Sequence, residues 1–142
     1  MTIKPRAEKQ LKLSFHDLIS DVEKLFEESA IHKGGGPETT ALANLVAVAQ
    51  TVSCLKQLEL HIQYQAAREP KKWQEGHRFA ANLLKRIGES GIVAQKADQA
   101  RKQLGSDDAS SPEALRTWLA VQYLGFVRRK YLFLAKLGKE VS

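Results

Sequence analysis

The chain has 142 residues, of which 43% are hydrophobic and 27% are charged, and its formal net charge is +6. This length predicts a single domain over residues 1–142, large enough to bury a core without disulfides or a structural metal. A lone cysteine excludes an internal disulfide, and the apolar runs fall far short of the roughly 20 residues that a membrane span needs. No secretory signal is visible at the start, so we expect a soluble cytoplasmic protein.

Residues 6–30 form the first predicted helix, because apolar side chains recur there at intervals of three and four. The run Gly34-Gly35-Gly36-Pro37 should end this segment decisively. A triple glycine can also cradle phosphate, but the sequence lacks the G-x-x-x-x-G-K-[ST] pattern and a preceding strand. We therefore predict a flexible connection between two antiparallel helices.

Residues 39–69 are the longest predicted element and contain neither glycine nor proline. Leucine, valine and isoleucine recur at the helical period, so an uninterrupted helix of roughly 45 Å is expected, ending before Pro70. Cys54 lies within this segment and is expected to be a small buried apolar residue. The rest of the bundle should be built on this helix.

Three further helices are predicted after Pro70. The third covers residues 72–87 with Trp73 facing inward, the fourth covers residues 92–104, and the last begins with Ser111 as the N-cap and continues to residue 137. The last helix is apolar on more than one side, so it should be either central to the bundle or half-covered by a neighbouring subunit. In the loop of residues 105–110, Asp107 and Asp108 are expected to be turn residues rather than cation ligands.

No strand-like alternation and no internal repeat occurs along the chain. The expected fold class is therefore all-α, a bundle of about five helices with three long ones.

The sequence contains no recognisable catalytic or metal-binding pattern. Its four histidines are not spaced three or four residues apart, and no H-E-x-x-H or G-x-S-x-G motif is present. Small helical ribonucleases of the HEPN type carry an Arg followed a few residues later by a His, whereas Arg68 precedes His77 by nine positions with Pro70 between them. We predict a protein that is not an enzyme and needs no cofactor.

Positive charge is concentrated in the second part of the chain. Residues 1–67 carry seven Lys/Arg and eight Asp/Glu, whereas residues 68–142 carry fifteen and eight. This imbalance favours a surface that meets a polyanion such as nucleic acid, although ordinary solvated helix faces carry similar charges. The candidate nucleic-acid-binding residues are Arg68, Lys71, Lys72, Arg78, Lys85, Arg86, Arg128, Arg129 and Lys130.

Two features refine this prediction. Arg78 and Lys85 are seven residues apart, so on a helix both could follow a phosphate backbone along one face. Tyr64 and Trp73 are interleaved with the basic residues, where they either stack on unpaired bases or pack in the core. With no base-reading motif in the sequence, binding should depend on the phosphate backbone and on shape.

The end of the 39–69 segment, LKQLELHIQYQAARE, resembles a stretch of the small helical subunit of type III CRISPR effector complexes. In that family a helix begins near a threonine pair and ends in a leucine-rich run leading to Tyr-x-Ala-Gly-Arg. This sequence has Ala67 in place of the family's glycine. The last helix, EALRTWLAVQYLGFVRRKYLF, is also similar to the family's C-terminal helix. The matching positions in the 39–69 segment are Thr39, Thr40, Leu55, Leu58, Tyr64, Ala66 and Arg68.

The resemblance implies a non-catalytic subunit of an antiviral ribonucleoprotein that stacks in several copies along a filament of other effector subunits. Its basic face would contact the duplex of guide and target RNA, with Arg68 facing the RNA. An arginine at a helix end can equally well bond the last carbonyls of its own helix. The alternative function is a helical adaptor that binds only proteins, through exposed apolar residues of the last helix.

Overall fold

The computed structural model describes residues 3–105 and 110–141, with side chains described as far as residue 136. The described residues are helical with no strand, which confirms the all-α class. None of the helices described is long and apolar enough to cross a membrane. The elements are α1 (Pro5–Lys12), α2 (Phe15–Ser29), η1 (Ile31–Lys33), α3 (Thr39–Ala49), α4 (Leu55–Arg68), α5 (Pro70–Trp73), α6 (Phe79–Ile87), α7 (Ile92–Leu104) and α8 (Pro112–Val141).

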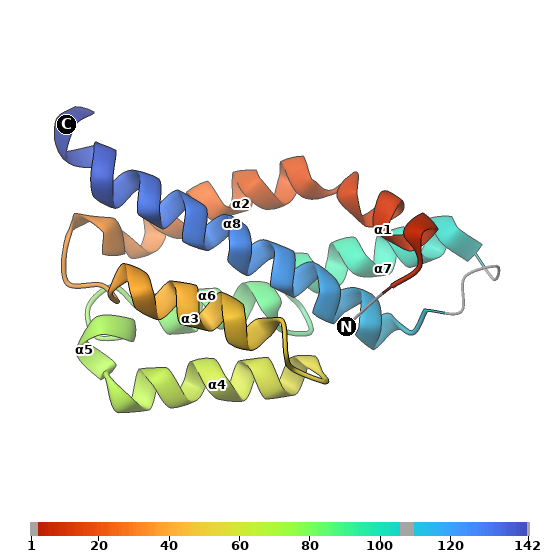
Figure 1. Ribbon diagram of the computed structural model, residues 1–142, viewed down its shortest axis with the longest axis horizontal. Helices are drawn as coiled ribbons and strands as arrows, with labels where there is room; N and C mark the ends of the chain where they lie inside the picture. Colours follow the sequence, from red (N-terminus) through yellow and green to blue (C-terminus); the bar gives the residue numbers. More distant parts are fainter. Residues whose placement is uncertain (1–2, 106–109, 142) are drawn as a thin grey trace.

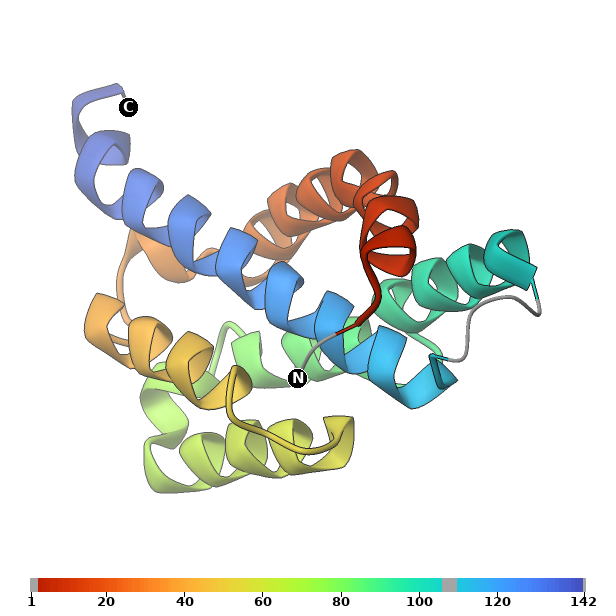
Figure 2. The ribbon, with the colours of Figure 1, turned by 45° about the vertical axis from the view of Figure 1, so that its right-hand side comes forward.

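Helix α8 is the central element of the bundle. It crosses the molecule diagonally, with α1 and α2 along one side and α3 and α4 along the other (Figures 1 and 2), and it contacts α1, α2, α3, α4, α7 and η1. Leu115, Leu119, Tyr123 and Val127 on this helix are almost completely buried. Of the two predicted explanations for its many apolar side chains, the central position is therefore confirmed.

The predicted 39–69 helix is wrong as a single element, because residues 50–54 break it. Helices α3 and α4 run in opposite directions and lie side by side (Figure 1). At the break, Thr51 Oγ1 donates to the carbonyl of Val48 at 2.8 Å, and the Ser53 N–H donates to Gln57 Oε1 at 2.9 Å. Such side-chain hydrogen bonds offer the backbone an alternative to the helix. Cys54 is consequently extended and half-buried just before α4, not buried within a helix.

The start of α4 depends on a residue far away in the sequence. The Leu55 N–H donates to Glu113 Oε1 at 2.7 Å, so a carboxylate in the first turn of α8 satisfies an N–H at the start of α4. This contact fixes the α3–α4 hairpin against the central helix, and no local sequence pattern predicts it.

The first and third predicted helices are also divided. Residues 6–30 form α1 and α2, with a break at Leu13 and Ser14, where Ser14 Oγ donates to the carbonyl of Leu11 at 2.7 Å. Residues 72–87 form α5 and α6, separated by a turn in which Gly76 and Arg78 have positive φ angles. The expected five helices with three long ones thus become a larger number of shorter segments in the described chain, with α8 much the longest.

Other sequence predictions are confirmed. Helix α7 has the predicted bounds of 92–104, and Trp73 faces the core. The Ala114 N–H donates to Ser111 Oγ at 3.1 Å, which makes Ser111 the cap of a helix that begins at Pro112 and continues beyond the predicted end. The predictions for Asp107 and Asp108 lie outside the described residues.

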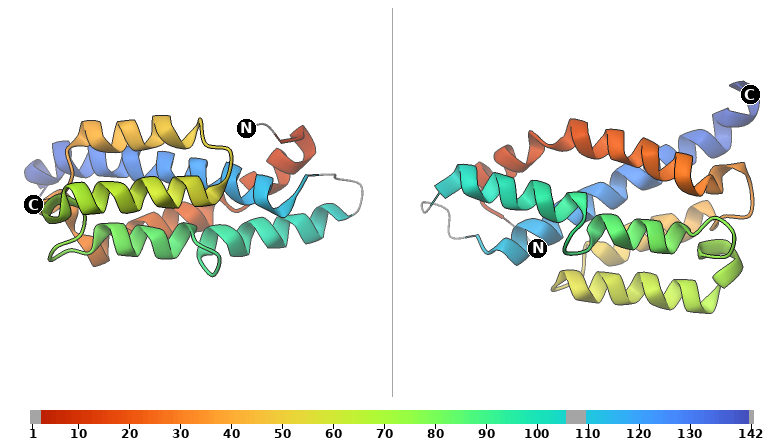
Figure 3. Two further views of the ribbon diagram at one scale, coloured as in Figure 1. Left: turned by 90° about the horizontal axis from the view of Figure 1, so that it is seen from below. Right: turned by 180° about the vertical axis from the view of Figure 1, so that it is seen from behind.

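Helices α6 and α7 form a row along the back of the molecule (Figure 3). Gly91 is buried where the chain passes from one to the other, and a Cβ there would clash with the backbone carbonyls of Lys85 and Arg86. This row places α5 at one end of the molecule and the C-terminal turn of α7 at the opposite end. The two ends carry separate groups of basic side chains.

Candidate nucleic-acid interface

Three of the predicted residues lie close together at the α5 end of the molecule. Arg68 is the last residue of α4, Lys71 lies in α5, and Arg78 immediately precedes α6. All three side chains are exposed, and within the described part of the chain none of them forms an ion pair with a carboxylate. Their charge is therefore available to an anionic ligand.

Lys72, the neighbour of Lys71, has a different role. Its amino group lies 3.2 Å from Glu38 and 3.7 Å from Glu69. The hydrogen bond to Glu38 is the main cause of a raised Lys72 pKa, and the charge of Glu69 adds to it. The contact with Glu38 joins α5 to the start of α3. The two carboxylates partly neutralise the charge of Lys72.

The Arg86 side chain is largely buried and forms hydrogen bonds within the protein. Its side chain is 11% exposed. Nε donates to Asp21 Oδ2 at 2.8 Å, and Nη2 donates to Glu28 Oε2 at 3.1 Å. Nη1 donates to the Asn82 carbonyl at 3.0 Å, and the Tyr123 hydroxyl donates to the same oxygen of Asp21 at 2.7 Å. This network joins α2, α6 and α8, so Arg86 lies apart from the exposed cations at α5.

The burial of this network also shifts the pKa of its members. Burial, followed by the hydrogen bond to Asp21, strongly raises the pKa of Tyr123, so its hydroxyl keeps the proton that it donates. Burial lowers the pKa of Arg86, but the nearby Tyr123, Asp21 and Glu28 more than compensate, and the net shift is upward.

The expected alignment of Arg78 and Lys85 on one helix face is wrong. The backbone of Arg78 has a left-handed conformation, with a φ of 55°, and Arg78 precedes the first residue of α6. The spacing of seven residues therefore does not correspond to two helical turns. Lys85 is exposed on α6, which places it in the same element as Arg86 but on the solvent side.

The three basic residues of α8 are consecutive, so their side chains leave the helix on different faces. Arg128 and Arg129 are exposed, and the Arg129 guanidinium lies 5.5 Å from the centre of the Phe126 ring. The Lys130 amino group lies 5.6 Å from the centre of the Phe133 ring. These residues belong to the last part of α8, so they are separate from the segment that carries Arg68, Lys71 and Arg78.

Lys130 also influences His32 of η1. Burial is the main cause of a lowered His32 pKa, and the charges of Lys33 and Lys130 lower it further. The part of α8 that carries Lys130 therefore lies near the connection between α2 and α3. Arg128, in turn, lines a small cavity of about 110 Å³ beside Thr39 and Thr40 at the start of α3.

The two aromatic residues near the basic segment differ in exposure. Trp73 is 1% exposed and packs on Phe79. Tyr64 is 58% exposed on α4, between the exposed Leu60 and Arg68. Only Tyr64 of this pair can offer a ring face to a ligand, and together with the three cations it makes a surface that we call the α5 surface (Tyr64, Arg68, Lys71 and Arg78).

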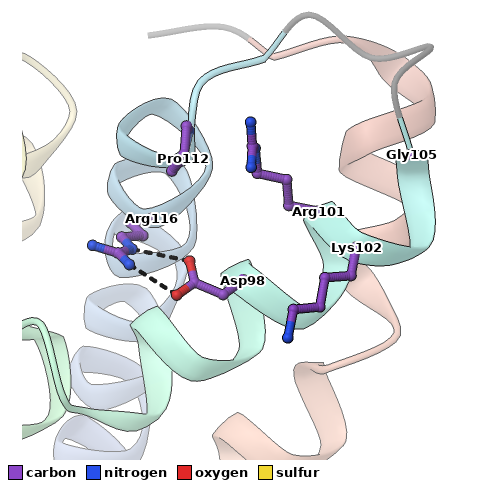
Figure 4. A pocket seen from close by; sticks show the side chains of 6 residues that line it. All are labelled: Asp98, Arg101, Lys102, Gly105, Pro112 and Arg116. Atoms are coloured by element: carbon purple, nitrogen blue, oxygen red, sulfur yellow. Dashed lines mark hydrogen bonds and ion pairs between the residues drawn. The ribbon is translucent and has the colours of Figure 1, made fainter.

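Sequence reasoning missed a group of basic residues at the other end of the molecule, namely Arg101, Lys102 and Arg116. A cavity of about 550 Å³ lies between the end of α7 and the start of α8 (Figure 4). The two sides of this site are separated by a loop in the sequence, so their proximity could not be seen from spacing. The cavity is lined by Asp98, Arg101, Lys102, Gly105, Pro112 and Arg116.

Among the described residues, no group of three or more His, Cys, Asp or Glu side chains is arranged to hold a metal ion. His77 Nδ1 accepts a hydrogen bond from the Phe79 N–H at 3.1 Å, whereas its buried Nε2 has no hydrogen-bond partner among the described residues. In comparisons with known proteins, no family model, no curated protein and no solved structure matches the chain. The similarity to the type III CRISPR small subunit therefore stays a prediction.

Proposed function

We propose that this protein is a non-catalytic, RNA-binding small subunit of a CRISPR RNA-guided effector complex. The observation that carries the proposal is the α5 surface, where three exposed cations and one exposed tyrosine occur within a short segment. Lys and Arg side chains neutralise phosphates, and an exposed ring can stack on an unpaired base. The resemblance supports the same surface, because Tyr64 and Arg68 are two of its matching positions.

The expected mode of binding follows from the chemistry of this surface. Arg68 ends a helix and Lys71 and Arg78 lie in or beside a turn, so these side chains do not form a continuous recognition helix. Lys and Arg side chains outside a recognition helix mainly contact phosphates, and phosphate contacts carry no sequence information. Binding should therefore be sensitive to salt and indifferent to sequence, with cleavage assigned to other subunits of the complex.

The test is charge reversal with a matched control. The variant R68E/K71E/R78E should lose at least about tenfold in affinity for short RNA oligonucleotides of unrelated sequence, at about 0.1 M salt. The control K9E/K24E/K56E reverses three exposed cations on α1, on α2 and in the first turn of α4, and it changes the net charge equally. Fluorescence anisotropy measures the RNA affinity of both variants. Equal losses in the two variants, or no loss in the first, would refute the proposal.

Arg86 should not be included in such a variant, because its replacement would disturb the Asp21 network and confuse folding with binding. A further readout is the salt dependence of affinity. Each phosphate contact contributes about −0.7 to −0.9 to the slope of log K against log salt. Losing three contacts should therefore reduce the magnitude of the slope by about 2.

A helical adaptor that binds only proteins is the second candidate. The observation that favours it is the pair of exposed apolar side chains on α4, Leu60 at 64% and Tyr64 at 58%, four residues apart on one face. On α8, Phe133 is also exposed. If this function is correct, L60D should abolish partner binding, whereas R68E/K71E/R78E should leave assembly intact; co-purification with the native partners distinguishes the two.

A further inference from the structure

A small cavity with an uncharged lining lies between the end of α3 and the first half of α8. Its volume is about 170 Å³, and no charged side chain lines it, so it offers an ion no opposite charge. The lining combines an indole ring, two apolar side chains and two side-chain amides. These residues are Ala49, Gln50, Trp118, Val121 and Gln122.

The break between α3 and α4 brings the two amides to this cavity. Helix α3 lies beside α8 and ends at Gln50, whose N–H donates to the carbonyl of Val46 at 3.2 Å (Figure 1). Gln122 lies four residues after Trp118 on α8, so the two side chains share one face of that helix. Gln50 and Gln122 therefore line one small space from two different helices.

Both amides remain open to a ligand. Gln50 is exposed and Gln122 is half-buried, and within the described part of the chain neither side chain forms a hydrogen bond. Gln74, by contrast, accepts a hydrogen bond from the Ala81 N–H at 2.9 Å. Each open amide supplies a carbonyl acceptor and an NH₂ donor, so together they can pair with the polar edge of a flat ligand.

The indole of Trp118 is held in place from the opposite side. Phe15 of α2 stacks on it, with the ring centres 6.2 Å apart, and Phe126 packs edge-on against Phe15 at 5.1 Å. Helices α2 and α3 lie on opposite sides of α8 (Figure 2), so the indole lies between Phe15 and the cavity. A ring that is already ordered loses little conformational freedom when a ligand stacks on it.

We propose that this cavity binds a nucleobase, stacked on Trp118 and hydrogen-bonded to Gln50 and Gln122. A base is flat and uncharged, carries donors and acceptors along its edge, and stacks on aromatic side chains whatever its identity. The volume of about 170 Å³ lies below the roughly 300 Å³ at which sites for drug-sized ligands begin, so it suits a single ring system.

The base is supplied either by a free nucleoside or by an unpaired position of RNA, and only the second source rests on the proposed function. Helix α3 has 11 residues and therefore extends about 16 Å from its start, where Glu38 contacts Lys72 of α5, to the cavity. One strand of RNA can thus contact both the α5 surface and the cavity.

Nuclear magnetic resonance titration of the ¹⁵N-labelled full chain tests the site. Adenosine, uridine and ribose are added separately. The nucleosides should shift the indole N–H resonance of Trp118 and the side-chain amides of Gln50 and Gln122, whereas ribose should shift none of them. Trp73, the other tryptophan, is 1% exposed and serves as an internal control whose indole resonance should not move. No shift at Trp118 with either nucleoside, or equal shifts with ribose, would overturn the proposal.

Two pairs of variants connect the shifts to the lining. Q50A/Q122A removes both amides and should weaken nucleoside binding at least about fivefold, measured at the Trp118 indole. Q99A/Q103A removes two exposed amides from α7 and should bind as the wild type does. Equal affinities in these two variants would contradict the proposal.

The second pair tests stacking. W118L should lose about tenfold in affinity, measured at the amides of Gln50 and Gln122, whereas W118F keeps an aromatic ring and should lose less. Circular dichroism verifies that the variants fold. A W118L affinity equal to that of the wild type would show that the indole does not hold the base.

Short RNA identifies the source of the base. Shifts at Trp118 with single-stranded RNA as well as with nucleosides indicate RNA, and shifts with nucleosides alone indicate a free nucleoside. Equal shifts with the corresponding RNA duplex would contradict stacking on an unpaired base. R68E/K71E/R78E should keep the nucleoside shifts even where it loses RNA affinity, which separates failure of this site from failure of the α5 surface.

Discussion

The strongest structural prediction concerns Arg86, which sequence reasoning placed among the nucleic-acid-binding residues. R86M keeps a long apolar side chain but removes the guanidinium, so that among the described residues Asp21 keeps only the Tyr123 hydroxyl as a side-chain donor. Asp21 is 17% exposed in this pair, so its charge would remain largely buried without a cation.

The expected cost follows from these contacts. Breaking a buried ion pair by removing one partner costs about 3–5 kcal/mol. Two observations reduce this figure: the Tyr123 hydroxyl still donates to Asp21, and Glu28 is 53% exposed and regains water. We expect a loss of about 2–4 kcal/mol in the free energy of unfolding, which corresponds to a fall in Tm of about 5–15 °C for a chain of this size.

Urea unfolding followed by circular dichroism measures this loss. K85M is the matched control, because Lys85 is the exposed neighbour on the same helix and its replacement should change stability by less than about 0.5 kcal/mol. A double-mutant cycle with D21N should give a coupling of at least about 1 kcal/mol. If R86M is as stable as K85M, Arg86 is not structural and the reasoning fails.

Two further predictions concern stability. Burial, with the charges of Glu89 and Glu113, raises the pKa of Glu59 above its ordinary value of 4.5. The charged form of Glu59 therefore destabilises the folded protein once the pH exceeds that value. E59Q should have a higher Tm than the wild type at pH 7 and no advantage below about pH 4.5, and an unchanged Tm at pH 7 would contradict this. G91A should be strongly destabilised because its Cβ would clash with backbone carbonyls. G125A should gain up to about 1 kcal/mol, because its Cβ would make only an ordinary contact of 3.7 Å with the Arg129 guanidinium; equal urea midpoints for the two variants would refute the packing argument.

The sequence by itself determined the all-α class and several element boundaries. The regular apolar spacing of the helices is a local property, and so are the Ser111-Pro112 start of α8 and the glycine breaks before α3 and before α7. Local signals of this kind act through neighbouring residues, which is why they can be read along the chain. The inward position of Trp73 also followed from its place in an apolar pattern.

The break between α3 and α4 could be predicted only in part. The Thr51-Val52-Ser53 run contains residues whose side chains compete with helical hydrogen bonds, but it contains no glycine or proline. What makes the break favourable is the Glu113 carboxylate, which accepts the Leu55 N–H from a distant part of the chain. Periodicity continues across residues 50–54 because both helices pack on the same core.

The functional meaning of the basic residues was decided by tertiary structure. Arg86 and Arg68 look alike in the sequence, yet one is enclosed by carboxylates from α2 and the other extends into solvent. The cavity beside Arg101 likewise exists only because α7 and α8 come together. The charge of a side chain is set by its sequence, but whether that charge meets a ligand or a buried carboxylate depends on which helices pack around it.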